Sequence, residues 1–166
     1  MAMRHQARTS RRALIALAIC LVLAVWPAPA TTQGEDIAVV VHPSVPVDNL
    51  TTAELRRILL GDREFWPSGD RVTLLIRAPI ARERDVVVKS LCEMTEAQFR
   101  QHWIGKVFRA ETPSGPKIVY SAEMARDQAS RLVGAITFLP MSQVGSGLKV
   151  VKLDGRSPGQ AGYRLK

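Results

Sequence analysis

The feature that most constrains the fold is an unbroken apolar run, Ile-Ala-Val-Val-Val, at residues 37–41. A strand with one solvent-exposed face alternates polar and apolar residues, whereas a continuous β-branched run is typical of a strand buried on both faces. Similar short runs recur later in the chain, at 72–76, 135–139 and 148–153. A sheet built from such strands needs helices on both of its faces.

Two helix starts between these strands are strongly marked. Thr51 is followed three residues later by Glu54, and Thr95 by Gln98, which is the capping-box pattern that satisfies free amides at a helix N-terminus. Gly61 is suited to end the first of these helices. The sequence therefore predicts helices that begin at residues 51 and 95.

The second of these helices is predicted to end near Gly105 and to carry Phe99 and Trp103 four residues apart, on one face. We expect both side chains to be largely buried. Further helices are predicted from about 82 to 93 and from 121 to 132.

Strands that alternate with helices predict an α/β fold, a three-layer sandwich with a mainly parallel sheet flanked by helices. With 166 residues the chain has room for one domain of ordinary size. We expect that domain to span 31–166, with its core in 36–153 and a turn-rich tail, 154–166, lying over the surface.

The first thirty residues have the pattern of a cleavable export signal. Basic residues between Arg4 and Arg12 precede an uncharged apolar run that ends at Trp26, and Ala28-Pro29-Ala30 fits a small-x-small cleavage site. A membrane anchor is the alternative, but a span needs about 20 apolar residues and prolines end this run too early. We expect general secretion rather than the twin-arginine route, cleavage after Ala30, no membrane span afterwards and a periplasmic protein.

Composition excludes several classes of function. The net charge is +8, but four arginines fall in the acid-free leader, which leaves 19 basic against 15 acidic side chains and no basic stripe for nucleic acid. Two cysteines, one of them in the leader, leave Cys92 without an internal disulfide partner. No ligand spacing for a metal and no nucleophile motif occurs, so we expect no cofactor, no metal site and no enzyme activity.

One candidate site stands out near residue 77. A buried strand ends at Arg77, and the next helix begins with Arg82. Loops beyond the carboxyl ends of parallel strands bind ligands in such sheets, and helix amides and arginines favour an anion. The alternative is that Arg77 and Arg82 form surface ion pairs with Glu83, Asp85 or Glu54, and the residues alone leave both interpretations open.

Several segments resemble phosphate ABC transporter substrate-binding proteins. One stretch of the chain resembles their L-x-x-x-E-L-x-x-I-F-L-G and W-x-x-G segment. The matching residues are Leu50, Glu54-Leu55, Ile58 to Gly61, Trp66-Pro67 and Gly69. Residues 134–138, Gly-Ala-Ile-Thr-Phe, resemble their G-A-I-G-Y signature, with Thr137 in place of the second glycine. The resemblance extends over 36–153 and suggests a short, single-lobe branch of that family.

This resemblance implies a type II periplasmic binding protein fold and an oxyanion ligand. The family's phosphate loop reads R-x-x-x-S-G-T; Arg77 matches its arginine, whereas Ala81, Arg82 and Glu83 stand at the Ser, Gly and Thr. The loop has therefore lost its hydroxyl donors and gained a carboxylate. Ser44, in the loop after the first strand, is a candidate replacement donor.

Two functions follow as hypotheses. The first is an exported, non-enzymatic solute-binding-like protein that holds phosphate or another small oxyanion, with Arg77 and Arg82 as charge partners. The second is an envelope protein-interaction module that has lost high-affinity ligand binding. A transporter or another envelope protein is the expected partner in either case.

Overall fold

Strand β1 (Ile37–Val41) lies inside a six-stranded sheet of order β2-β6-β1-β5-β3-β4, and all five of its residues are fully buried. The computed structural model describes residues 34–166, which form one compact unit; the expected leader lies outside the described residues. The burial of β1 on both faces confirms the interpretation of its apolar run.

The remaining strands all run in one direction, opposite to β1. They are β2 (Asn49–Leu50), β3 (Thr73–Arg77), β4 (Lys117–Val119), β5 (Ala135–Pro140) and β6 (Lys149–Leu153). β1 pairs antiparallel with β5 and β6, while β2 pairs parallel with β6 and β3 pairs parallel with β4 and β5. The sheet is thus mostly parallel, as the sequence predicts.

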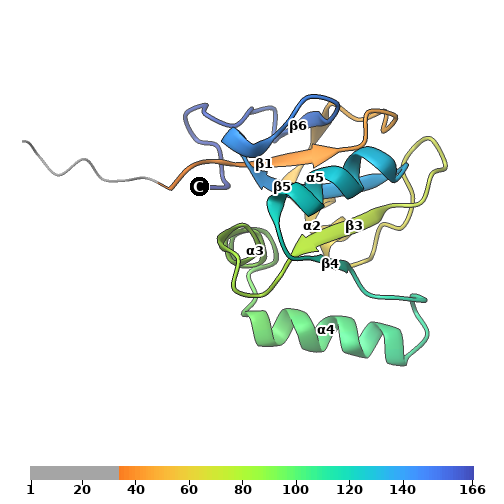
Figure 1. The fold of residues 1–166 in the computed structure, drawn as a ribbon. Coiled ribbons are helices and arrows are strands. Elements are labelled where there is room, and N and C mark those ends of the chain that lie inside the picture. Colours follow the sequence, from red (N-terminus) through yellow and green to blue (C-terminus); the bar gives the residue numbers. More distant parts are fainter. Residues whose placement is uncertain (1–33) are drawn as a thin grey trace, which may run out of the picture. The chain divides into compact units, whose positions relative to one another are not determined.

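Helices cover both faces of this sheet, which gives the three-layer α/β architecture (Figure 1). On one face lie α2 (Thr52–Leu59) and α3 (Arg82–Val87), which continues as the π-helical turn η1 (Val88–Cys92). The other face is covered by α5 (Ala122–Arg131), whose small buried residues Ala122, Ala125 and Ala129 let it approach the strands closely. A 3-10 turn, Met141–Gln143, follows β5.

Both predicted capping boxes are present. The Thr51 hydroxyl accepts from the Glu54 amide, and the Glu54 carboxylate accepts from the Thr51 amide; Thr95 and Gln98 repeat the arrangement at the start of α4 (Glu96–Phe108). These local hydrogen bonds fix the two helix starts independently of the core.

Some predicted boundaries differ from the structure. The helix expected over 82–93 has the predicted extent, ending at Cys92 before the left-handed Glu93, but it changes to π-helical geometry at Val88. α4 continues past Gly105 to Phe108, because Gly105 keeps a helical conformation there. The tail was expected on the surface, yet Tyr163 and Leu165 are buried in the core.

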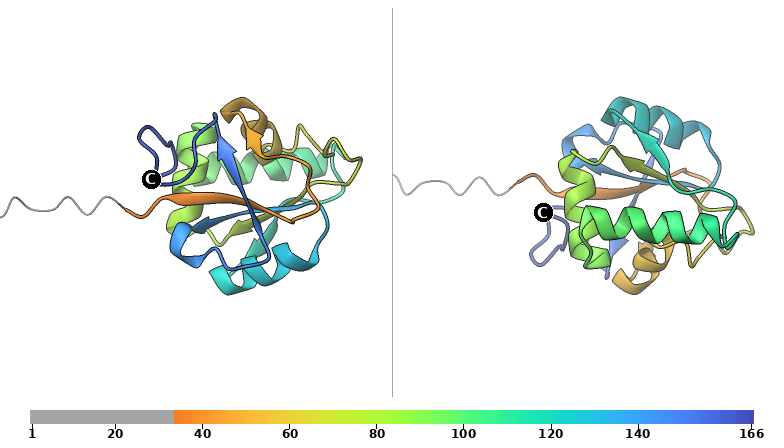
Figure 2. Two further views of the ribbon diagram at one scale, coloured as in Figure 1. Left: turned by 90° about the horizontal axis from the view of Figure 1, so that it is seen from above. Right: turned by 90° about the horizontal axis from the view of Figure 1, so that it is seen from below.

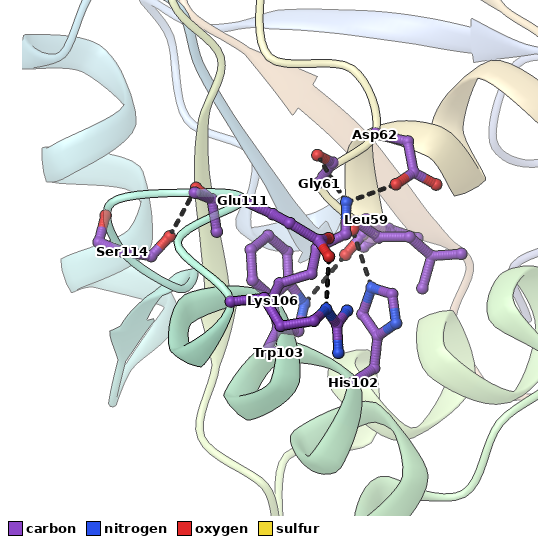
Figure 3. A network of polar contacts seen from close by, with 11 residues as sticks. Leu59, Gly61, Asp62, His102, Trp103, Lys106, Glu111 and Ser114 are labelled. Atoms are coloured by element: carbon purple, nitrogen blue, oxygen red, sulfur yellow. Dashed lines mark hydrogen bonds and ion pairs between the residues drawn. The ribbon is translucent and has the colours of Figure 1, made fainter.

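Besides packing against η1, helix α4 is attached by side-chain hydrogen bonds to the backbone at the end of α2 (Figure 3). His102 donates to the carbonyl of Leu60 at 2.9 Å, and the Trp103 indole donates to that of Leu59 at 3.1 Å. The Lys106 ammonium reaches the Gly61 carbonyl at 3.2 Å. Three side chains thus satisfy carbonyls that a helix end leaves without partners.

This attachment explains why one burial prediction is only half right. Phe99 is buried as predicted, but Trp103 is only partly buried. Its ring packs on Gly61, while its indole points to the end of α2 rather than into the core. Trp103 is therefore less buried than predicted, although it still packs against the edge of the core.

Thr137 offers a test of the core's energetics. It is fully buried on the α5 side of β5, and its hydroxyl has no acceptor within residues 34–166. A buried unsatisfied hydroxyl is unfavourable by about 1–3 kcal/mol, so Thr137→Val should raise the free energy of unfolding by roughly 1 kcal/mol. Thermal unfolding followed by circular dichroism measures this, and an unchanged or lower Tm would contradict it.

Candidate functional site

Arg77 ends β3, and its guanidinium is the centre of the candidate site. Because side chains alternate along a strand, Arg77 lies on the same side of the sheet as Leu75, beneath the start of α5. Its Nη2 donates to the Tyr120 carbonyl at 3.5 Å, and its Nε is buried with no acceptor in the described part of the chain. The side chain is only 15% exposed, so this unmet donor lies in a largely dry environment.

Glu83 is the carboxylate that Arg77 meets. The two groups approach to 3.5 Å, and the Glu83 side chain is only 10% exposed. The contact is longer than an ideal charge-assisted hydrogen bond, and it leaves Arg77 Nε unused. Glu83 therefore neutralises the charge of Arg77 without accepting from all of its N–H donors. This contact is one of the ion pairs that the sequence offered as the alternative to an anion site.

A second acid lies near the same guanidinium. Glu123, in the first turn of α5, has a pKa lowered mainly by a hydrogen bond to its own backbone amide and one to the Ser121 hydroxyl, with smaller contributions from the charges of Arg126 and, last, Arg77. An anion arriving at Arg77 therefore meets the Glu83 carboxylate directly, and the charge of Glu123 acts on it only from a greater distance.

The backbone of the site is held from below by Arg84. Its Nη1 donates to the Arg77 carbonyl at 3.0 Å, while Nε and Nη2 grip both oxygens of Glu96 at 2.8 and 2.7 Å. Arg84 is nearly buried and also lies over the Phe99 ring at 5.5 Å. The end of β3, the start of α3 and the start of α4 are thus tied together.

The other residues predicted for the loop contribute little directly. Ala81 caps α3 without a side-chain hydrogen bond, and its amide donates to the Ala78 carbonyl at 2.9 Å. Arg82 is exposed and turns to the N-terminal segment, where its guanidinium lies against Gly34 and donates to the Glu35 carbonyl at 2.8 Å. Of the two arginines, the structure places only Arg77 beside Glu83.

Ser44 lies at the opposite end of the sheet. It follows Val41 in β1, and Val41 pairs with Ile136 near the start of β5, whereas Arg77 is at the finish of a strand parallel to β5. Its hydroxyl is hydrogen-bonded to His42 Nδ1 at 2.7 Å. Because β1 runs against its neighbours, the loop after it cannot deliver Ser44 to Arg77.

The contribution of the segment after β4 could not be recognised from the sequence. The Tyr120 carbonyl reaches Arg77 because the preceding residue, Val119, pairs directly with Arg77. The only signal available was the apolar pair Ile118-Val119 after Pro116, which is too short to distinguish a strand from a loop.

Cys92 is a free cysteine that lies buried in the core. Burial raises the pKa of the Cys92 thiol to about 11, as expected of a core residue rather than a nucleophile. Within residues 34–166 no cluster of three or more His, Cys, Asp or Glu side chains could hold a metal ion. None of the helices described there is long and apolar enough to cross a membrane.

Comparison with solved structures identifies the fold. The chain is similar to a phosphate ABC transporter substrate-binding protein from Clostridium perfringens, solved with bound phosphate, at 18% identity over 75% of this chain and 47% of that one, with a TM-score of 0.59. An ABC-type phosphate transport receptor from Vibrio cholerae matches at 16% identity over 80% and 55% of the two chains, with a TM-score of 0.60. PstS from Borrelia burgdorferi matches at 14% identity over 75% and 49%, also with a TM-score of 0.60.

These likenesses establish a shared fold with phosphate-binding proteins. The chain spans about half the length of the structures it matches. No protein-family model and no curated protein matches the sequence.

Proposed function

We propose that this chain is an exported, non-enzymatic solute-binding-like protein that holds phosphate or a related small oxyanion at Arg77, in competition with Glu83. The observation that carries the proposal is the buried Arg77 Nε, which has no acceptor among residues 34–166. A buried N–H without an acceptor is unfavourable, and an oxyanion provides several acceptor oxygens at once. The fold shared with phosphate-binding proteins agrees with this assignment.

Binding at this site is expected to be weak. The oxyanion must displace or share the Glu83 carboxylate, which already neutralises Arg77. Ala81 and Glu83 provide no hydroxyl donor in exchange. The leader predicted at 1–30 and cleaved after Ala30 would deliver the protein to the periplasm, where a transporter or another envelope protein is the expected partner.

Titration calorimetry with phosphate, sulfate and a dicarboxylate tests the assignment. Arg77→Ala removes a charge-assisted contact of about 1.5–3 kcal/mol, so it should weaken oxyanion binding by roughly ten- to a hundredfold. Arg131→Ala, which removes an exposed arginine of α5, is the matched control. Arg82→Ala should change affinity little, because Arg82 is bonded to Glu35.

Two results would overturn the assignment. One is wild-type protein that binds none of the three anions, and the other is an affinity that Arg77→Ala leaves unchanged. In either case an envelope protein-interaction module, without a small ligand at Arg77, would be the better description.

A further inference from the structure

An apolar groove lies between α4 and β4, the edge strand of the sheet. Figure 2 shows α4 from a second direction, lying lengthwise across the molecule. The groove has a volume of about 650 Å³. Its apolar walls are formed by Phe99, Ile104, Val107, Phe108, Ile118 and Tyr120. Contiguous exposed apolar surface of this kind marks an interaction site.

Much of this wall is open to solvent. Phe108 is 89% exposed, Tyr120 73% and Ile104 54%, and Val107 and Ile118 are also exposed. If each large apolar side chain covers about 200 Å², their exposed parts amount to about 600 Å². A standard protein interface buries about 800 Å² per partner, a little over half of it non-polar, so this surface is large enough for a stable interface.

Most of the charged side chains that line the groove are already paired with each other. Arg84 and Glu96, which line it, satisfy each other through two hydrogen bonds. Arg100 also lines it and is exposed, and no carboxylate within residues 34–166 pairs with it. An occupant must therefore cover an apolar surface and one arginine.

The spacing on α4 identifies an occupant that does both. Arg100, Ile104 and Phe108 follow one another at intervals of four residues and form one stripe of the helix. If two α4 helices cross antiparallel about a two-fold axis at Ile104, each Phe108 meets Arg100 of the other copy. An arginine over an aromatic ring is a favourable contact, and a two-fold dimer is the commonest oligomer.

Strand addition is a poorer alternative. β4 has only three residues, and Pro116 immediately before it has no amide hydrogen to donate. We propose that this chain forms a two-fold dimer through the α4 face and its groove, with Ile104 at the axis and each Phe108 inserted into the groove of the other copy. The groove adjoins the Arg77 site, because Tyr120 and Arg84 line the groove and also contact Arg77, but the proposed dimer contacts do not include the Arg77–Glu83 pair itself.

Cysteine cross-linking tests the position of the axis. Ile104→Cys places two thiols next to each other in the dimer, so mild oxidation should give a disulfide-linked dimer on a non-reducing gel. Ser130→Cys, at an exposed position on α5 across the sheet, is the matched control and should form no disulfide-linked dimer on the same gel. No linked dimer for Ile104→Cys, or equal linking of both variants, would overturn the proposal.

Sedimentation of the purified protein tests the interface itself. The wild-type sedimentation coefficient should rise with protein concentration to that of a dimer, and Phe108→Ser should weaken association by about tenfold or more, since aromatic anchors dominate interfaces. Thermal unfolding of Phe108→Ser should be unchanged at low concentration, because the side chain is exposed in the single chain. A wild-type protein that remains monomeric at every concentration would overturn the proposal. So would a protein that forms no dimer but binds anionic vesicles as the wild type and not as Phe108→Ser.

Discussion

Gly134→Ala is expected to destabilise the fold by at least about 3 kcal/mol, one of the two largest effects that the structure predicts. Gly134 begins the turn into β5 with φ of +75°, and an added Cβ would lie 2.2 Å from the Arg71 carbonyl oxygen. Left-handed backbone costs alanine about 1–2 kcal/mol by itself, and the clash with main-chain atoms forces a further displacement. Thermal unfolding should show a Tm lower by roughly 10 °C.

The displacement matters because the Gly134 carbonyl joins two elements. It accepts from the Trp66 indole at 2.8 Å and from the Thr73 amide at 2.9 Å. Gly155→Ala is the matched control, since Gly155 has φ of +78° with no atom near the position of an added Cβ. Equal losses of stability in the two variants would show that the close approach at Gly134 is not a determinant of the fold.

Glu96→Ala is the second large effect, with an expected loss of about 3 kcal/mol in the free energy of unfolding. Arg84 is only 6% exposed, and removal of Glu96 leaves its guanidinium with the Arg77 carbonyl and the Phe99 ring as partners. Breaking a buried pair typically costs about 3–5 kcal/mol, and the lower end applies because Glu96 itself is 33% exposed. Urea unfolding gives the value directly.

A surface pair and a double variant complete this test. Asp85→Ala breaks the exposed Lys89–Asp85 pair and should cost no more than about 0.5 kcal/mol. Adding Arg84→Met to Glu96→Ala removes the uncompensated charge and should recover part of the loss. If Glu96→Ala is no more harmful than Asp85→Ala, Arg84 does not organise the junction of β3, α3 and α4.

Local signals in the sequence predict most of the architecture. The apolar run at 37–41 indicates burial by its composition, and each capping box, at Thr51 and Thr95, depends on a neighbour three residues away. Both signals can therefore be recognised without tertiary information. β2 and β4 could not be recognised in the same way, because two or three residues carry no periodicity and are held in place by their partners β6 and β3.

The site is predicted less completely than the fold. Arg77 was identified because it ends a buried strand, and its proximity to Glu83 follows from the turn into α3. The position of Ser44 depends on the direction of β1, and that of Arg82 on a contact with Glu35, forty-seven residues away. Strand direction and long-range contacts of this kind leave no mark in a single sequence.

Phosphate titration of Glu83→Gln against the wild type tests the central claim most directly. If Glu83 competes with the ligand for Arg77, removing its charge while keeping its size should strengthen phosphate binding by roughly tenfold, and Glu83→Thr should act in the same direction. Asp85→Asn, at an exposed position on the same helix, should leave the affinity unchanged. Unchanged or weaker phosphate binding in a folded Glu83→Gln protein would contradict competition at Arg77 and, with it, the proposed oxyanion site.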